Sequence, residues 1–402
     1  MSWLGNRTTS VPVILCTFVT FGSLTATLFA EPATTRPAGV DRETLRRKVA
    51  PAIQKGLRFL ENAQAPDGGW KGGPQGTDPA ITAMAAKAFI QDPAYGPKHP
   101  VVRRALTLVL KFQQPDGGIY DPRAGYANYS TSVVLMMLAA LKDPALDKPI
   151  AAAQDFLKGK QWDESKTDPQ DQPVEISHAW YGGAGYGEKK TRPDLSNTQM
   201  MIEALHESGL PPSDPAYKKA MCFISRCQML SETNDQPFAQ GAQDGGFIYS
   251  PANNGESKAG TITVGEKNFL RSYGSMTYAG FKSMIYANVD RQDPRVQAAW
   301  NWIRRYYTLE HNPNMPGAQS KQGLFYYYHT FAKALRAWGE PVIVDEKNVH
   351  HDWRMDLAEH ILKQQKPDGS WVNSADRWME GNPYLVTSYS LLALQEAIRD
   401  DR

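Results

Sequence analysis

A turn of the type Gln-x-Pro-Asp-Gly recurs along the chain, and each copy closes one predicted helix and precedes another. Three copies are complete and three are interrupted or weaker. The copies are Gln64 to Trp70, Gln114 to Tyr120, Gln161 with Trp180 to Gly183, Gln228 with Asp244 to Tyr249, Gln322 to Tyr326, and Gln365 to Trp371. Repetition of one unit in this way is typical of architectures that stack a single supersecondary motif. The chain is therefore predicted to consist of six related units.

Two classes of helix alternate along these units. The helix before each turn has apolar residues at helical spacing, as at Val49, Ile53, Leu57 and Leu60. The helix after each turn is more apolar, and that at 133–141 is apolar on every side, which predicts burial on every side. Each of these second helices carries a threonine near its start: Thr82, Thr131, Thr198, Thr277, Thr330 and Thr387. We therefore expect an all-α (α/α)6 toroid of six helix pairs in two concentric layers over residues 41–402.

The first forty residues differ from the rest. Residues 1–30 hold one charged side chain, Arg7, followed by an apolar run from Val11 to Ala30, which is typical of a secretory signal peptide. The alternative is an uncleaved N-terminal membrane anchor. Residues 31–40 are predicted to be a flexible lead-in. An exported protein, periplasmic or extracellular, is the resulting expectation.

Charge and metal-ligand patterns narrow the classes of partner. The chain has 44 Lys+Arg against 42 Asp+Glu and no basic stripe, so nucleic acid is not an expected partner. No Cys/His spacing suits zinc, and we expect no metal or cofactor. A small-molecule or lipid-like ligand is the expected partner, with membrane-surface association and the oligomeric state left open.

The turns resemble the Q-W repeats of squalene–hopene cyclases and other triterpene cyclases, and the inner threonines resemble those of protein prenyltransferase β subunits. The resemblance covers most of residues 45–399. It implies a terpenoid cyclase/prenyltransferase toroid with a cavity opening at the N-terminal ends of the inner helices. Long insertions at 163–193, 231–272 and 311–322 are predicted to gather at that same end.

The catalytic motifs of these families are degenerate here. Asp194-Leu-Ser-Asn-Thr198 is the best match to the cyclase Asp-x-Asp-Asp-Thr, but Ser196 replaces the proton-donating Asp, and a hydroxyl cannot protonate an alkene. Of the three zinc ligands that the resemblance to prenyltransferases implies, only the histidine is kept, as His329. The resemblance therefore predicts the fold without specifying an activity.

Polar and aromatic residues just before the inner threonines form the candidate site. Asp194 and His329 are the candidate catalytic pair, as base and acid or as groups that orient a ligand. The candidate ligand-binding residues are Ser196, Asn197, Tyr273, Ser275, Tyr326 and Tyr328, joined by Trp180 and Tyr186 from a preceding loop. The alternative is that Asp194 caps its helix and His329 is a satisfied core histidine. Asp78 has the same offset and is interpreted as a plain cap.

Three functions remain open from the sequence. The first is binding, with or without transformation, of an apolar or isoprenoid-like ligand. The second is a carbohydrate-active (α/α)6 enzyme, for which Asp78 and Asp194 are the available carboxylate pair. The third is a non-catalytic interaction scaffold. We expect an apolar cavity in the first case, a wide polar groove in the second and a filled barrel in the third, because fold alone does not fix function.

Overall fold

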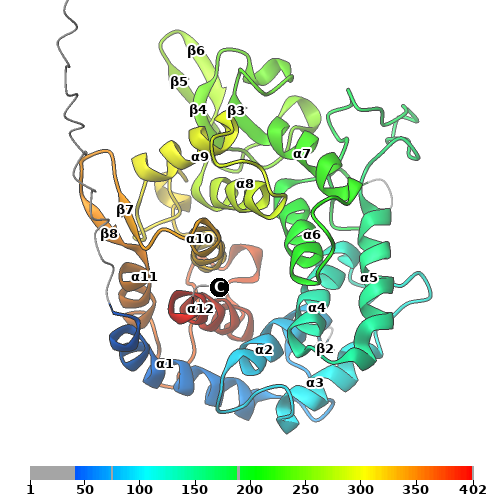
Figure 1. The fold of residues 1–402 in the computed structure, drawn as a ribbon, viewed down its shortest axis with the longest axis vertical. Coiled ribbons are helices and arrows are strands. Elements are labelled where there is room, and N and C mark those ends of the chain that lie inside the picture. The colour runs from blue at the N-terminus through cyan, green and yellow to red at the C-terminus, as the bar shows by residue number, and fades with distance from the viewer. Residues whose placement is uncertain (1–40, 74–75, 188–190, 401–402) are drawn as a thin grey trace, which may run out of the picture. The chain divides into compact units, whose positions relative to one another are not determined.

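The computed structural model describes residues 41–73, 76–187 and 191–400, so the predicted leader and lead-in lie outside the described residues. Twelve α-helices in this part form two rings (Figure 1). The inner ring is α2 (Pro79–Gln91), α4 (Ala127–Leu141), α6 (Leu195–Glu207), α8 (Gly274–Tyr286), α10 (Leu324–Trp338) and α12 (Pro383–Ile398). The outer ring is α1 (Arg42–Ala63), α3 (Pro100–Leu110), α5 (Asp147–Lys160), α7 (Pro215–Cys227), α9 (Pro294–Arg305) and α11 (Trp353–Leu362).

The inner ring is closed. Each inner helix packs on the next, and α12 packs on α2. At this seam the Gln395 side chain donates a hydrogen bond to the Ala88 carbonyl oxygen (2.8 Å). The predicted (α/α)6 toroid is confirmed for the described residues, and a closed ring removes the exposed ends that an open array of repeats must cap.

The repeated threonines are explained by the turns. In five units the threonine Oγ1 accepts a hydrogen bond from a backbone N–H of the preceding turn, for example from Trp70 to Thr82 (3.2 Å) and from Trp371 to Thr387 (3.0 Å). In the sixth, Thr330 donates instead to the Tyr326 carbonyl oxygen. The first five contacts each fix a turn onto the start of an inner helix, whereas the sixth lies within α10.

The repeated glutamines link neighbouring units. Gln64 Nε2 donates to the carbonyl oxygens of Gly68 in its own turn and Val101 in the next outer helix. Gln365 does the same to Gly369 and to Ala52 of α1, so this linkage crosses the closure of the ring. The glycine of the turn is required at both places. Gly68 has φ +98° and Gly369 φ +95°, and an added Cβ would lie 2.4–2.6 Å from a carbonyl oxygen of the next outer helix.

Four two-stranded antiparallel sheets depart from the expected all-helical chain. They are β1 (Lys71–Gly73) with β2 (Gly76–Thr77), β3 (Gln228–Leu230) with β4 (Gln243–Phe247), β5 (Thr261–Val264) with β6 (Lys267–Leu270), and β7 (Val342–Val344) with β8 (His350–Asp352). The first three pairs lie in segments that lead from an outer helix to the next inner helix, so they belong to the end of the barrel where the inner helices begin.

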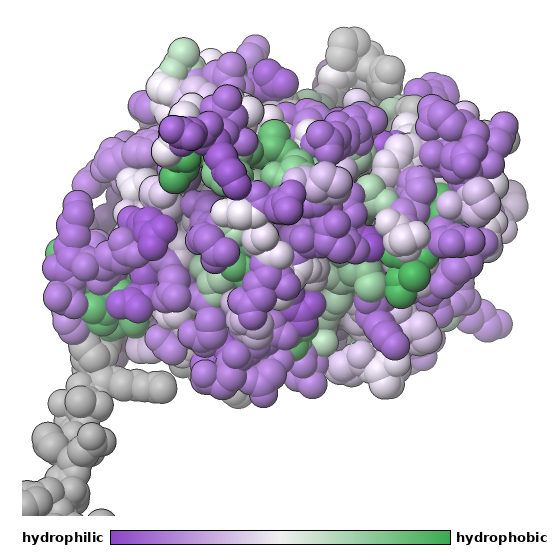
Figure 2. Space-filling model, turned by 90° about the horizontal axis from the view of Figure 1, so that it is seen from above, coloured by the Kyte–Doolittle hydropathy of each residue, from purple (hydrophilic) through white to green (hydrophobic). Residues whose placement is uncertain are grey.

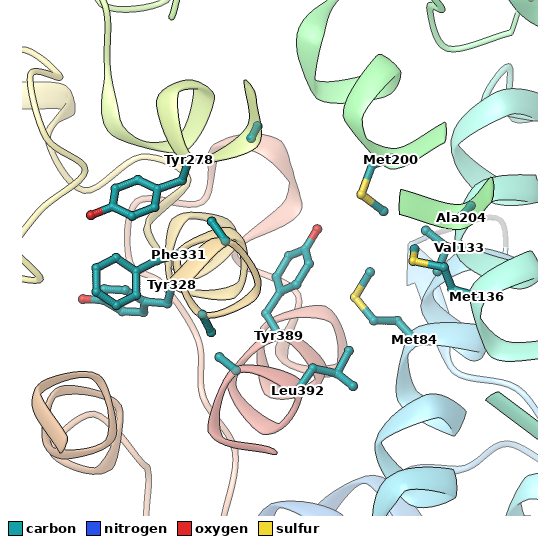
Figure 3. Close-up of a cluster of buried hydrophobic side chains, with 14 of the residues drawn as sticks. Met84, Val133, Met136, Met200, Ala204, Tyr278, Tyr328, Phe331, Tyr389 and Leu392 are labelled. Carbon is teal, nitrogen blue, oxygen red and sulfur yellow. The ribbon is translucent and has the colours of Figure 1, made fainter. Parts of the chain in front are cut away.

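Apolar side chains fill the middle of the barrel. Figure 3 shows Met84, Met136 and Met200 turned toward the centre from α2, α4 and α6, with Tyr389 facing them from α12. All four are buried. Methionine suits this place because its unbranched side chain adapts to irregular gaps. The centre is thus packed with apolar side chains of the described residues.

Charged side chains fill the barrel where the inner helices end. Glu203 of α6 bonds Lys282 of α8 and lies 2.8 Å from Lys333 Nζ of α10. Lys333 also pairs with Glu207, which in turn pairs with Lys87 of α2. Burial alone would raise the pKa of Glu203, but Lys282 and Lys333 lower it well below its usual value. The network therefore stays ionised and links four inner helices.

The outer surface is mostly hydrophilic on the face drawn in Figure 2, with single hydrophobic residues scattered over it. This agrees with amphipathic outer helices whose apolar stripes face inward. Among the described residues, no helix has both the length and the apolar character that crossing a membrane requires.

Candidate functional site

A cavity of about 520 Å³ opens at the N-terminal ends of the inner helices. Its wall takes residues from the start of all six inner helices or from the loops that lead into them. The residues that matter most are Asp78, Asp121, Tyr126, Tyr129, Tyr186, Ser196, Asn197, Tyr249, Lys258, Tyr273, Ser275, Tyr326, Trp378, Glu380 and Tyr389, with Ile81, Met276 and Leu385 as apolar members.

Phenol rings form much of this wall and are held by hydrogen bonds to one another and to neighbours. Tyr326 Oη lies 3.2 Å from Ser196 Oγ and accepts a hydrogen bond from Gln199 Nε2 (3.0 Å). The hydroxyls of Tyr129 and Tyr389 lie 3.4 Å apart. These contacts join α6 to α10 and α4 to α12 across the ring, and they separate the cavity from the methionines beneath it.

The mouth carries exposed aromatic and apolar side chains. Tyr126 is 45% exposed, Trp378 41% and Met379 45%, and all three line the cavity. Trp378 and Met379 both have positive φ, 57° and 64°, which costs energy for residues with a side chain. Such strain is retained where the surrounding structure requires it, and functional sites are where it gathers.

Asp78 and Asp121 are two carboxyl groups in neighbouring sectors of the wall. Asp78 caps α2, where its Oδ1 accepts a hydrogen bond from the Ile81 N–H (2.9 Å). Burial, and to a lesser degree the charge of Asp121, raises the pKa of Asp78. Hydrogen bonds from Arg123, including one of 2.7 Å, lower the pKa of Asp121. The wall therefore holds one carboxyl with a raised pKa, Asp78, and one with a lowered pKa, Asp121.

Glu380 is a third carboxyl in the cavity wall, and its hydrogen bonds show that it caps the start of α10. It comes from the loop before α12 but accepts hydrogen bonds from the Tyr326 N–H (2.8 Å) and from Asn373 Nδ2 (2.6 Å). Helix α10 begins after Gly323 with no capping side chain of its own. Burial raises the pKa of Glu380 to about 7 despite these hydrogen bonds. Glu380 therefore serves the start of α10 from the neighbouring unit.

The single lysine of the cavity lies on the far side from the aspartates. Lys258 Nζ is 4.4 Å from the centroid of the Tyr249 ring and forms an ion pair with Glu256. Arg192 pairs with the same glutamate. The single carboxylate of Glu256 therefore offsets part of the charge of these two cations. Within the described ranges, no group of three or more His, Cys, Asp or Glu side chains is placed to hold a metal ion.

Six of the predicted site residues reach the cavity: Tyr186, Ser196, Asn197, Tyr273, Ser275 and Tyr326. Their predicted role in ligand binding stays a prediction. The Asn197 side chain is held in place by the cap of α6, because its Nδ2 donates a hydrogen bond to Asp194 Oδ2 (2.8 Å).

The predicted placement of Asp194 at the cavity mouth is wrong. Asp194 is fully buried behind the wall and caps α6, accepting hydrogen bonds from the Asn197 N–H (2.9 Å) and Nδ2 (2.8 Å). Burial raises its pKa to about 6. The same capping geometry that places Asp78 in the cavity turns Asp194 away from it, because Asn197 and Tyr249 cover it.

His329, Tyr328 and Trp180 also lie away from the cavity. His329 is buried one turn below Tyr326 and stacks near Tyr389, and burial lowers its pKa to about 3, so it is neutral. Tyr328 lies on the opposite side of α10 from Tyr389 (Figure 3) and donates to the Leu309 carbonyl oxygen. Trp180 packs on Trp162 in a separate apolar cluster.

Sequence reasoning missed Asp121, Tyr129, Tyr249, Trp378, Glu380 and Tyr389 as wall residues. The signal for Tyr129 was present, because the positions one and two before the repeated threonine line the cavity in most units. The other five lie in loops or farther along a helix, where the repeat gives no register.

The chain was compared with known proteins. No family model matches it, and no curated protein matches it in sequence. Solved structures do match. A type II terpene cyclase, MstE from Scytonema, in complex with geranylgeranyl dihydroxybenzoate, is 12% identical with a TM-score of 0.53, over 89% of this chain and 99% of that one. A family 76 glycoside hydrolase from a bovine Bacteroides thetaiotaomicron strain is 12% identical with a TM-score of 0.53, over 86% and 77%.

An inactive α-1,6-mannanase of Salegentibacter, in complex with α-1,6-mannotriose, is 9% identical with a TM-score of 0.50, over 86% and 99%. At such identities the likeness shows the fold alone. The chain is thus similar to toroids of two unrelated activities, in agreement with the expected divergent terpene cyclase-like toroid.

Proposed function

We propose that this protein is exported and binds a neutral, hydroxyl-bearing ring compound, of which sugars are the favoured class, in the cavity at the N-terminal ends of the inner helices. One observation carries the proposal: flat aromatic rings, hydroxyls and acidic side chains line the same cavity. Aromatic rings stack on the apolar faces of a sugar ring, and carboxyl and hydroxyl groups form hydrogen bonds with its hydroxyls.

The polar groups favour a sugar over an isoprenoid. Asp78 and Asp121 lose water when a ligand fills the cavity. A hydrocarbon chain offers them no hydrogen bond, so their desolvation would oppose binding. A sugar replaces the lost water contacts. The exposed ring of Trp378 at the mouth adds a stacking surface for a second sugar unit.

An isoprenoid-like ligand is the second candidate. Ile81, Met276 and Leu385 give the wall an apolar part, and the MstE structure with its geranylgeranyl ligand supports this choice at the level of fold. The scaffold hypothesis is disfavoured because the barrel is packed at its centre but not at this end.

Native mass spectrometry of the full chain distinguishes these candidates. The protein is offered an oligosaccharide mixture and, separately, geranylgeraniol. Oligosaccharide complexes are expected. Because Trp378 is half exposed and strained, Trp378→Ala should fold normally yet weaken binding about tenfold, the value of about 1.4 kcal/mol that a stacking contact supplies.

Val349→Ala is the matched control, since Val349 is an exposed apolar residue outside the cavity wall. It should bind as the parent does. Complexes with geranylgeraniol and none with sugars would replace the sugar proposal by the second candidate. No complex with either would contradict both.

A further inference from the structure

The acidic side chains of the cavity are not evenly distributed around the ring. Asp78 begins α2, and Asp121 lies in the loop that leads into α4, which packs directly on α2. The opposite arc, from α6 to α10, presents Asn197, Ser275 and Tyr326. The one carboxyl described there, Glu380, already accepts hydrogen bonds from the Tyr326 N–H and from Asn373. A ligand in the cavity therefore has Asp78 and Asp121 on one side and mainly hydrogen-bonding and aromatic groups on the other.

The two aspartates differ in their charge state for reasons that the geometry supplies. Arg123 donates to both carboxylate oxygens of Asp121 and holds it ionised. Asp78 pairs with no such cation among the described residues, and burial, with a smaller contribution from the charge of Asp121, raises its pKa. Two neighbouring carboxyl groups whose pKa values are pushed apart form an acid and a base in one site.

Polar groups on the α6 and α10 side of the cavity can bond the other edge of a ligand. The side chains of Ser196, Asn197 and Tyr326 line this side, and Ser196 Oγ lies 3.2 Å from Tyr326 Oη. A hydroxyl-bearing molecule can bond these groups while its opposite edge faces α2 and α4.

Other reaction classes fit the wall poorly. Ser130, Ser196 and Ser275 are present, but the cavity residues include no histidine to activate a serine as nucleophile. A phosphate ester would meet the carboxyl groups of Asp78 and Asp121, and the one cation among the described lining residues, Lys258, already pairs with Glu256. Cleavage of a neutral C–O bond between a sugar and its leaving group needs an acid and a carboxylate, and these are present.

We propose that the cavity hydrolyses glycosides, with Asp78 as the general acid and Asp121 as the base that activates water. This rests on the proposed binding of a sugar. Asp78 donates its proton to the glycosidic oxygen as the bond from that oxygen to the anomeric carbon breaks. A water oxygen bonds the anomeric carbon, and the water gives a proton to the Asp121 carboxylate. Asp121 then releases that proton to solvent, and Asp78 takes one up.

The test uses aryl glycosides with two leaving groups. The probes are 4-methylumbelliferyl and 2,4-dinitrophenyl α- and β-glycosides of glucose, mannose, galactose and N-acetylglucosamine, offered to the full chain. Asp78→Asn keeps a good helix cap but has no proton to give. It should lose at least about 100-fold in kcat/KM on the methylumbelliferyl glycoside that the parent cleaves. It should keep activity within a few-fold on the dinitrophenyl glycoside, whose leaving group needs no protonation.

Asp121→Asn should lose activity on both probes, because neither leaving group replaces the base. Added azide, a small anionic nucleophile, should restore part of it and give a glycosyl azide. The matched control is Asp214→Asn: Asp214 caps the outer helix α7, is followed by proline as Asp78 is, and accepts from the Ala216 N–H at the same 2.9 Å. Its activity should equal that of the parent.

The outcomes separate the two proposals. Sugars that bind but are not cleaved would overturn hydrolysis and leave the binding site in place. Equal loss on both leaving groups in Asp78→Asn would overturn its role as acid. If no glycoside binds in native mass spectrometry, the proposed function fails and the hydrolysis with it.

Discussion

The two ends of the inner ring are built from the same six helices but treat polar groups in opposite ways. Where the helices end, Glu203, Lys282 and Lys333 are buried and satisfy one another. Where they begin, Asp78, Asp121 and Ser275 line a cavity that a ligand can fill. The first arrangement pairs its charges within the protein, whereas the second leaves polar side chains open to a ligand. Burial of charge by itself therefore does not identify a functional site.

Removing the charge of Glu203, at the end of the barrel where the inner helices end, should have the largest effect on the free energy of unfolding. Glu203→Gln leaves Lys282 and Lys333 without their shared buried carboxylate, and removal of one partner from a buried ion pair costs about 3–5 kcal/mol. Urea unfolding at pH 7 measures this loss. Glu266→Gln, in the exposed turn between β5 and β6, is the control and should change stability by less than about 0.5 kcal/mol.

The corresponding carboxyl-to-amide change at the cavity end, Asp78→Asn, should lower the free energy of unfolding by less than about 0.5 kcal/mol, because asparagine caps a helix as well as aspartate does. If Glu203→Gln and Asp78→Asn prove equally costly, the contrast between the two ends is wrong.

Asp194 is buried like Glu203 but forms no ion pair of its own within the described residues, so its effect on stability should depend on pH. Its pKa of about 6 in the folded chain exceeds the ordinary 3.8, so its contribution to stability is full below pH 3.8 and is lost as the pH rises to 6. Asp194→Asn stays neutral and keeps a cap. Relative to the parent it should therefore gain up to about 3 kcal/mol between pH 3.8 and 6 and nothing further above.

Unfolding of both proteins by urea across pH 3.5–7 checks this, with Asp214→Asn as a control that should follow the parent. A stability difference that does not change with pH would show that Asp194 ionises normally in the folded protein.

Most of the fold, but less of the site, was predictable from the sequence. The repeated glutamines and threonines fix each turn through local hydrogen bonds, so Gln64 and Thr82 already specify a unit. Tyr273 and Tyr326 were found because they hold a fixed offset from those threonines. Asp121 and Trp378 were not, because their positions depend on how irregular loops cross between units.

His329 was misplaced because the repeat does not give depth along the helix. It lies one turn beyond Tyr326 on nearly the same side of α10, so it meets Tyr389 and the charges of Glu203 and Lys333 deeper in the barrel. Asp194 was misplaced because a cap is identical in sequence whether its second oxygen faces a cavity or, as here, Asn197.

Hydroxyl-radical footprinting of the full chain, with and without an oligosaccharide bound in native mass spectrometry, tests the central claim most directly. Tyr126, Trp378 and Met379 are exposed around the mouth, and Ile262 and Val349 are exposed outside the cavity wall. The account predicts that the ligand slows oxidation of the first three several-fold and leaves the last two unchanged. Unchanged oxidation at the mouth, or protection at Ile262 or Val349, would contradict the assignment of the cavity as the binding site.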